Sequence, residues 1–273
     1  MAILKATCMK TLITALLMAL PSLALCAELV ETDSTDSIPA FTSLCSIDIP
    51  ADSYTLDPCF TIPGLGLFTK VGDGRFRSLD AERSPDMAEF MRLDNIYYDQ
   101  VVGLTYVMLV RSGSDVYLLS DDCTCIGRFD TNSFRIFPGQ TGSYYAVEYH
   151  ADGSALYSMP LSSDTEACAL AKSKEYISRV LPVKDGACLF ASGCSIYLCQ
   201  NGEITPYLTV DKPITDFALT NSDILVATDN HLLAIGDNEI SVIAQGELRS
   251  LLYDNGRTYV INHDGSILYS DNF

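Results

Sequence analysis

Hydrophobic and polar positions along this chain follow the pattern of short β-strands separated by turns, from Phe41 to the C-terminus. Apolar runs of four to seven residues are bounded by Gly, Asp and Asn, which is typical of antiparallel meanders. Long stretches with the spacing of an amphipathic helix are absent, and the one helix-like piece, residues 85–92, also suits a loop with an outer strand. The pattern therefore predicts an all-β fold.

A turn motif, Asp or Ser followed by Gly or Asn, recurs at steps of 35–40 residues and divides the chain into similar units. A repeat of that length with a hairpin turn in every unit is typical of a β-propeller. A β-sandwich with coincidental turn spacing is the competing interpretation, but a sandwich has no fixed unit. Six copies predict six blades, with five or seven as alternatives. The copies are Asp73-Gly74, Ser112-Gly113, Asp152-Gly153, Ser192-Gly193, Asp229-Asn230 and Asp264-Gly265.

Each unit divides into four strands, with the motif turn between the second and the third. In the third unit we expect strands at 133–137, 144–149, 155–159 and 167–171. Each blade is then a four-stranded antiparallel sheet whose inner strands are apolar on both faces, because neighbouring blades cover them. A tyrosine recurs four residues after the motif glycine and is expected to pack between blades rather than to line a ligand surface. These tyrosines are Tyr117, Tyr157, Tyr197 and Tyr269.

The two ends of the domain predict how the ring closes. The spacing places the first strand of unit one near Tyr54, which leaves residues 41–50 as an unassigned segment with the alternation of a strand. At the other end, only eight residues follow Gly265, too few for a fourth strand. The N-terminal strand is therefore expected to complete the last blade, because closure removes exposed sheet edges.

Residues 1–27 have the pattern of a secretory signal peptide. A basic start, Lys5 and Lys10, precedes an apolar segment that is shorter than the roughly 20 residues of a membrane span. Cleavage after Ala24, Cys26 or Ala27 would fit the small residues there. Leu23-Ala24-Leu25-Cys26 also resembles a bacterial lipobox, so a lipid anchor at Cys26 is an alternative.

The rest of the chain divides into two parts. Residues 28–40 are acidic and rich in Ser and Thr, and we expect a flexible linker there. Residues 41–273 form the predicted propeller domain. The four-strand unit, the six-fold count and the signal peptide resemble the exported six-bladed β-propeller proteins of bacteria, a broad class that includes TolB-like and NHL-like domains.

That resemblance rests on the repeat and on the D-G-x-x-φ-Y turn, where φ is an apolar residue, and it covers residues 42–273. The chain has no Y-W-T-D motif, no sialidase Asp box and no Trp. The class implies binding and scaffolding more often than catalysis, and no site residues carry over from it.

Charge and cysteine content narrow the possible partners and bonds. A net charge of −18 leaves few cations to neutralise phosphates, so we expect no nucleic-acid partner. Eight cysteines follow Ala27, and an even number in an exported chain permits disulfides. Cys188 and Cys199 flank the predicted turn symmetrically and should lie opposite each other. Cys45 and Cys59 are the second candidate pair, on adjacent blades near the closure.

Candidate chemistry in the sequence is weak. Three histidines, His150, His231 and His263, stand beside motif turns, where solvent-exposed polarity explains them better than a metal site. Cys123-Thr124-Cys125 has no second pair at zinc-finger spacing, so a disulfide or buried thiol is favoured over metal or redox chemistry. No nucleophile, metalloprotease or phosphate-loop motif is present. We therefore expect no cofactor, no metal and no assigned catalytic residue.

The preferred interpretation is an exported, non-enzymatic binding module that recognises a protein or polymer partner through loops at one face of the ring. The periplasm, the cell surface and the medium are all open as destinations. The alternative is a hydrolase or lyase in the channel mouth, which two converging carboxylates with strongly shifted pKa values would favour. The expected contact residues lie in the connections between units: Arg92, Asn95, Asp130, Asn132, Lys172, Glu175, Asp211, Lys212 and Glu247.

Overall fold

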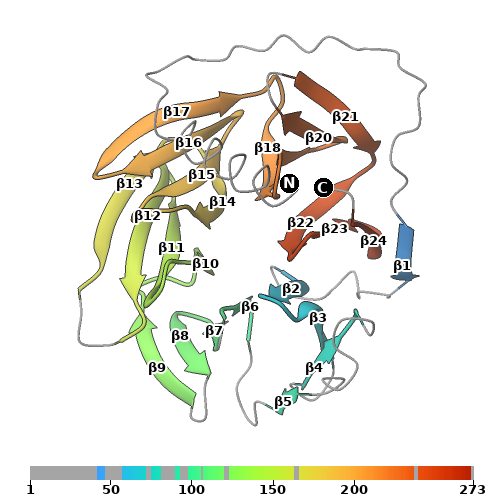
Figure 1. Ribbon diagram of the computed structural model, residues 1–273. Helices are drawn as coiled ribbons and strands as arrows, with labels where there is room; N and C mark the ends of the chain where they lie inside the picture. The colour runs from blue at the N-terminus through green and yellow to red at the C-terminus, as the bar shows by residue number, and fades with distance from the viewer. Residues whose placement is uncertain are drawn as a thin grey trace, which may run out of the picture.

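The structure is a computed structural model that describes residues 42–46, 57–71, 75–80, 90–92, 98–105, 107–119, 123–162, 166–236 and 239–271. The described strands form six four-stranded antiparallel sheets. The sheets stand around a common centre as the blades of a propeller (Figure 1). The all-β, six-bladed prediction is confirmed. The expected signal peptide and linker lie outside the described residues.

In blades 1 to 5 the first strand in chain order lies innermost, and the following strands lie progressively outward (Figure 1). Blade 1 consists of β2 (Cys59–Ile62), β3 (Gly66–Val71), β4 (Arg75–Ser78) and β5 (Phe90–Arg92). Blade 2 consists of β6 (Gln100–Gly103), β7 (Met108–Ser112), β8 (Asp115–Leu119) and β9 (Cys123–Arg128). Blade 3 consists of β10 (Phe134–Pro138), β11 (Ser143–His150), β12 (Gly153–Pro160) and β13 (Cys168–Ser173).

Blades 4 to 6 repeat this order, except that the outermost strand of blade 6 comes from the N-terminal side of the domain. Blade 4 consists of β14 (Ile177–Pro182), β15 (Cys188–Ser192), β16 (Ser195–Gln200) and β17 (Glu203–Thr209). Blade 5 consists of β18 (Ile214–Leu219), β19 (Ile224–Thr228), β20 (His231–Gly236) and β21 (Glu239–Gln245). Blade 6 consists of β22 (Leu248–Asp254), β23 (Arg257–Asn262), β24 (Ser266–Ser270) and β1 (Thr42–Ser46).

Strand β1 closes the ring. It pairs antiparallel with β24, from Thr42 opposite Tyr269 to Ser46 opposite Ser266, and gives blade 6 its fourth strand. The predicted closure is confirmed. The expected start of blade 1 near Tyr54 falls outside the described residues. Strand β2 begins at Cys59, directly after Pro58, which has no backbone N–H to donate to a sheet.

The repeated motif forms the turn between the second and third strands of a blade, as predicted. Five of its copies are described, and all five join these strands. Gly113, Gly193 and Gly265 have φ values of 59°, 59° and 84°, a left-handed conformation that glycine adopts without a Cβ clash. Asp73-Gly74 lies outside the described residues; the strands on either side of it, β3 and β4, pair antiparallel with Val71 opposite Arg75.

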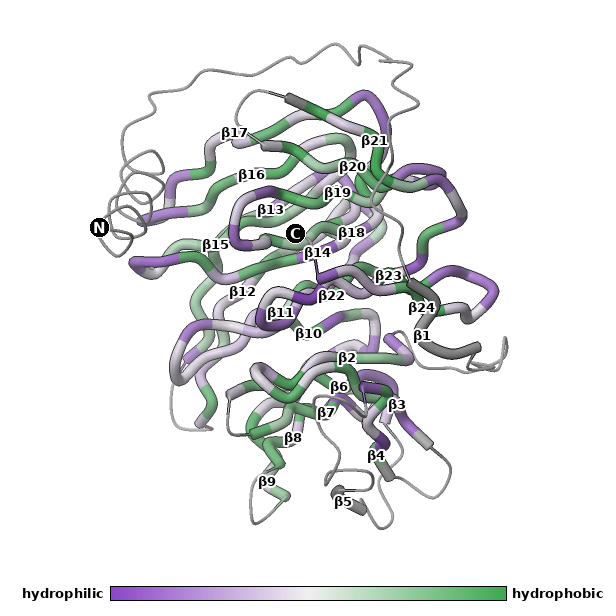
Figure 2. Tube along the Cα trace, turned by 45° about the vertical axis from the view of Figure 1, so that its right-hand side comes forward, coloured by the Kyte–Doolittle hydropathy of each residue, from purple (hydrophilic) through white to green (hydrophobic). Residues whose placement is uncertain are grey.

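The core consists of apolar clusters between adjacent blades. One cluster joins Phe137 and Val147 of blade 3 to Val180 and Phe190 of blade 4, with Tyr197 packed against it. Tyr269 packs in the same way against the cluster between blades 6 and 1, while Tyr117 and Tyr157 are half-buried on their strands. Hydrophobic residues follow the strands and hydrophilic residues the connections (Figure 2). The repeated tyrosines are therefore part of the scaffold.

No helix among the described residues is long and apolar enough to cross a membrane.

Candidate functional site

The centre of the ring carries one polar side chain from the start of each blade. These six residues, which we term the channel ring, come from the first residues of the innermost strands or from directly before them, so they lie at one end of the channel. Bulges at the starts of β14, β18 and β22 bend the backbone there. The channel ring consists of Asp57, Gln100, Arg135, Arg179, Asp216 and Ser250.

Asp57 is bound from two sides within the channel ring. Its Oδ1 lies 2.6 Å from Nη2 of Arg135, and its Oδ2 accepts a 2.6 Å hydrogen bond from Nε2 of Gln100. Burial by itself would raise the pKa of Asp57, but Arg135, Arg179 and the Gln100 hydrogen bond together outweigh burial and lower it. Asp57 is therefore a stable carboxylate that holds blades 1, 2 and 3 together.

Asp216 has a different environment on the other side of the channel ring. It lies 3.5 Å from Nε of Arg179, and its Oδ2 accepts hydrogen bonds from Ser250 Oγ (3.1 Å) and from the backbone N–H of Leu251 (2.8 Å). Burial raises the pKa of Asp216 by more than Arg179 and the backbone hydrogen bond lower it. The two channel carboxylates therefore have pKa values that are shifted in opposite directions.

The channel is narrow beside this ring. The cavity that Asp57, Gln100, Arg179 and Ser250 help to line has a volume of about 40 Å³. Such a space holds a water molecule, whereas small-molecule sites in proteins occupy roughly 300–1,000 Å³. The blades also approach closely, because a Cβ on Gly103 of β6 would lie 2.3 Å from the backbone oxygen of Thr61 in β2. The space beside the ring is therefore small for an ordinary small-molecule ligand.

Two stacked tyrosines lie beside the channel ring, and we term them the aromatic ledge. Tyr176, in the connection between blades 3 and 4, is 54% exposed and stacks on Tyr149 with ring centroids 4.4 Å apart and planes 9° apart. The Tyr149 hydroxyl donates a 2.9 Å hydrogen bond to the carbonyl of Ile177, and this bond holds the Tyr149 ring in place. Burial raises the pKa of Tyr149 strongly, so its hydroxyl stays protonated.

The aromatic ledge was not predicted from the sequence. Tyr176 does not belong to the repeated tyrosine column, and that difference is the signal that could have identified it.

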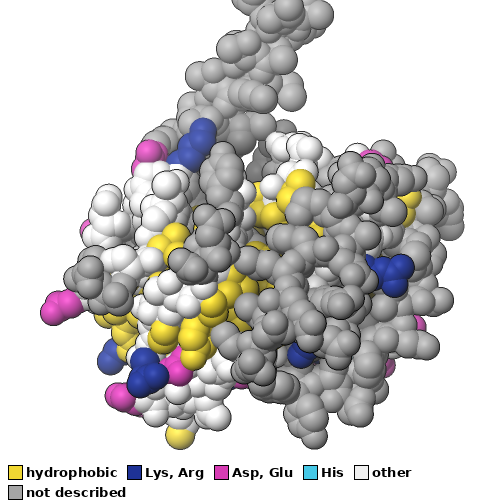
Figure 3. Space-filling view, turned by 90° about the horizontal axis from the view of Figure 1, so that it is seen from below, with side chains coloured by type: hydrophobic (Ala, Val, Ile, Leu, Met, Phe, Trp, Pro, Cys, Tyr) yellow, Lys and Arg dark blue, Asp and Glu magenta, His cyan; other side chains and the backbone are white. Residues whose placement is uncertain are grey.

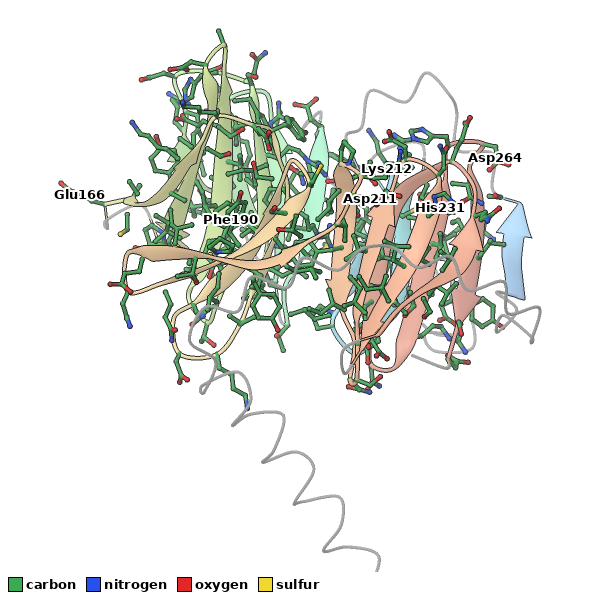
Figure 4. All side chains as sticks on the ribbon, turned by 90° about the horizontal axis from the view of Figure 1, so that it is seen from above. Glu166, Phe190, Asp211, Lys212, His231 and Asp264 are labelled. Atoms are coloured by element: carbon green, nitrogen blue, oxygen red, sulfur yellow. The ribbon has the colours of Figure 1, made fainter. Side chains whose placement is uncertain are left out.

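The expected contact residues share one face of the ring with the motif turns. In antiparallel blades the motif turns and the connections between blades lie at the same end, and hydrogen bonds join them: Ile214 N–H donates to Gly193 O (2.8 Å) and His263 N–H to Glu247 O (3.0 Å). Asp211, Lys212 and Asp264 lie toward the same edge of the ring in Figure 4. We term this side the loop face.

The described members of the expected contact set have exposed side chains on the loop face. They are Asp130, Asn132, Lys172, Glu175, Asp211, Lys212 and Glu247. Arg92 belongs to β5, but its side chain is not described, and Asn95 lies outside the described residues.

A shallow hollow of about 390 Å³ opens on the loop face between blades 5 and 6. Its lining includes Asp229 and Asn230 from one motif turn, His263 from the next, and Glu247. The three histidines do not meet: His150 ends β11, His231 begins β20 and His263 lies in a turn. Within the described part of the chain, no group of three or more His, Cys, Asp or Glu side chains is placed to hold a metal ion.

The cysteines are free thiols where the structure describes them. Cys188 and Cys199 lie directly opposite each other on β15 and β16, as the turn symmetry predicts. Cys45 lies on β1, the outermost strand of blade 6, whereas Cys59 lies on β2, the innermost strand of blade 1. Cys123 and Cys125 are exposed on β9 rather than buried.

In the view from below (Figure 3), the described lysine and arginine side chains at the left lie close to aspartate and glutamate side chains, and hydrophobic side chains are gathered between them. That side of the ring therefore presents no basic patch among its described residues.

No protein-family model matches the chain, and no curated protein matches it significantly. Solved structures of similar fold include virginiamycin B lyase from Staphylococcus aureus (14% identity, TM-score 0.53, covering 77% of this chain and 78% of that one). YCF48 bound to D1 peptide is another (12% identity, TM-score 0.54, covering 77% and 75%).

The extracellular domain of the putative one component system BT4673 from B. thetaiotaomicron is similar at 14% identity and a TM-score of 0.52, over 75% of this chain and 31% of that one. The chain thus spans about a third of that neighbour's length. At such identities the likeness concerns the fold alone. The chain is a six-bladed β-propeller whose blades resemble those of several functionally different proteins.

Proposed function

We propose that the protein is an exported, non-enzymatic recognition module that binds a protein or polymer partner on its loop face, around the mouth of the channel. The observation that carries the proposal is the aromatic ledge: Tyr176 is an exposed, rigidly stacked aromatic side chain among polar loops. Tyrosine is enriched among the residues that dominate binding energy at protein interfaces. Loops on a rigid scaffold are also the usual location of recognition residues.

The geometry of the channel supports binding outside the ring rather than inside it. The cavity beside the channel ring is small, so a partner would rest on the ledge and the exposed loop residues. Charges of both signs, such as Lys172 and Glu175, suit a mixed polar partner better than a polyanion. A neighbour of similar fold is described as bound to a peptide, which supports a peptide as the kind of partner we propose.

The test is a binding experiment with the whole mature protein. Envelope and culture-medium fractions of the producing cell are passed over the immobilised protein, and the captured partner is then titrated against purified variants. Tyr176→Ala should weaken binding about 10-fold or more, as expected of a central aromatic contact. Ile204→Ala is the matched control, because Ile204 is an exposed apolar residue on the outermost strand of blade 4. Equal affinity of both variants would refute the proposal.

An enzyme remains the second candidate because of one observation: Asp57 and Asp216 have oppositely shifted pKa values in the same channel. Pairs of this kind serve as base and acid in many active sites. Here both carboxylates are engaged by arginine and hydrogen-bond donors, which favours a structural role. Turnover of a glycan or peptide by the wild-type protein, abolished in a folded Asp216→Asn variant, would favour a hydrolase or lyase instead.

A further inference from the structure

The hairpin of β15 and β16 brings two cysteines together. The two-residue turn closes on Ser192 opposite Ser195, and the register continues without a bulge to Cys188 opposite Cys199. Directly opposed residues in an antiparallel pair have Cα atoms about 4.5–5.5 Å apart, within the roughly 4.4–6.8 Å range of disulfides. Their Cβ atoms, about 4.5–5.5 Å apart, would need to approach by up to about 1.7 Å to reach the mean disulfide separation of about 3.8 Å.

Both side chains point into the same apolar layer. Cys188 is 1% exposed and Cys199 is 3% exposed, and both belong to the core cluster between blades 3 and 4 together with Phe137, Leu156 and Val180. Cys199 makes a weak contact with the carbonyl of Leu170 (Sγ to O, 3.8 Å) and has no strong polar partner that a disulfide would remove.

The other cysteines are less well placed to bond with either thiol. Cys194 lies in the turn itself, and Cys168 is exposed on β13 of the neighbouring blade, where it is the nearest competitor for Cys199. Cys123 and Cys125 lie on β9 of blade 2, and Cys59 lies on β2 of blade 1.

We propose that Cys188 and Cys199 form a disulfide that locks the β15–β16 hairpin once the chain folds in an oxidising compartment. One thiolate attacks a small-molecule or protein disulfide, forms a mixed disulfide and releases one thiol. The second cysteine thiolate then attacks the bonded cysteine sulfur and releases the other thiol. Two cysteine protons and two electrons leave in total, and the oxidant is reduced to two thiols.

The structure also sets when this bond forms. Burial raises the pKa of the Cys188 thiol to about 12 and also raises the pKa of Cys199, so the folded protein holds almost no thiolate at neutral pH. Because the thiolate is the attacking species, oxidation belongs to the folding reaction, before blades 3 and 4 close over the hairpin. A chain that folds while reduced should then remain reduced.

The bond can be mapped in the full mature chain with a Cys194→Ala background. No Lys or Arg separates Cys188 from Cys199, so the two remain in one tryptic segment after Lys184, and Cys194→Ala leaves them its only cysteines. The protein is refolded in a mixture of reduced and oxidised glutathione, and free thiols are blocked with N-ethylmaleimide in denaturant. Cleavage after Tyr197 should then give two pieces that separate only on reduction. Complete alkylation of both cysteines would overturn the proposal.

Two further measurements separate this bond from its competitors. Cys168→Ala should leave the linked pieces unchanged; linked pieces that appear only in this variant would show that Cys199 pairs with Cys168 in the parent protein. Folded, reduced protein treated with oxidised glutathione should form the bond at least 100-fold more slowly than refolding protein, given the raised pKa values. The oxidised wild-type protein should melt about 3–6 °C higher than its reduced form, a difference that Cys188→Ala should abolish. An equal melting temperature for both forms would show that no such bond locks the hairpin.

Discussion

Two aspartate–arginine pairs in this protein show that burial decides how much stability is lost when one member of an ion pair is removed. Asp57 and Arg135 are each 15% exposed, lie 2.6 Å apart and belong to the channel ring. Asp115 and Arg128 lie 2.7 Å apart at the surface, where the arginine is 75% exposed. Removing one member of a buried pair strands its partner in a medium that solvates it poorly, whereas water replaces the lost contact at the surface.

We therefore predict that Asp57→Ala lowers the free energy of unfolding by about 3 kcal/mol, because Arg135 is left as an unpaired buried charge. Asp115→Ala is the matched control and should change stability little, since its arginine remains hydrated. Urea unfolding of both variants measures the difference. Similar losses in the two variants would contradict the structural role of the channel ring.

The opposite pKa shifts of the channel carboxylates predict opposite pH dependences. The pKa of Asp57 is lowered from 3.8, so its contribution to stability is complete above pH 3.8 and is lost as pH falls through its folded pKa. The pKa of Asp216 is raised from 3.8, so its ionisation costs stability as pH rises above 3.8 through its folded pKa.

Urea unfolding at several pH values between 3 and 7 tests this for Asp57→Asn and Asp216→Asn. The stability advantage of the wild-type protein over Asp57→Asn should shrink toward pH 3. Its advantage over Asp216→Asn should instead grow as the pH is lowered. Parallel trends in the two variants would show that the carboxylates share one environment.

At the scale of elements, blade 6 depends on a strand from the far end of the domain. β1 covers the edge of β24, with Cys45 opposite Ile267 and Ser46 opposite Ser266. Without β1, the backbone N–H and C=O groups on that edge of β24 would lose their partners and the ring would have an exposed edge. The hairpins of the other blades are local in sequence and depend less on distant segments.

Deleting residues 42–46 should therefore lower the melting temperature by several degrees and promote aggregation, because it removes the closing strand. Deleting residues 31–35, the same number from the predicted linker, is the control and should leave the melting temperature unchanged. Thermal unfolding followed by circular dichroism, with light scattering, measures both effects. A normal melting temperature after deletion of 42–46 would mean that closure contributes nothing to stability.

At the scale of the whole molecule, the excess of acidic residues is the dominant electrostatic feature. The net charge is −18, and like charges in the compact fold repel one another. The screening length falls from about 30 Å at 0.01 M salt to about 10 Å at 0.1 M, a range comparable with distances across a domain.

Raising sodium chloride from 10 to 200 mM should therefore increase the melting temperature by a few degrees, because screening relieves this repulsion. The Asp57–Arg135 pair is buried and should be little affected by the same change. Differential scanning calorimetry across a salt series measures the shift. A melting temperature that falls with salt would show that attractive surface pairs outweigh the net charge.

The repeat made the blades predictable because each hairpin is formed by residues close in sequence. The motif copies, such as Asp152-Gly153 and Ser192-Gly193, mark where the second strand of each blade ends and the third begins. The two-residue periodicity of a strand then determines which face of the sheet each side chain occupies. The channel ring was not predictable, because Asp57 and Arg135 are far apart in sequence and meet only through the ring. Tyr176 was not predicted because it lies in a connection between blades, and its departure from the repeated tyrosine positions is a weaker signal than the repeat itself.

By itself, the sequence determined the all-β class, the unit of four strands, the six blades and the closing strand. These follow from local turns, from the surplus strand at the N-terminal end and from the strand that is missing at the C-terminal end. It also placed Cys188 opposite Cys199, because hairpin symmetry is local. The tertiary structure alone decided which polar side chains meet in the channel and how little space lies beside them. Those properties depend on the angles between blades, which arise from packing summed around the whole ring.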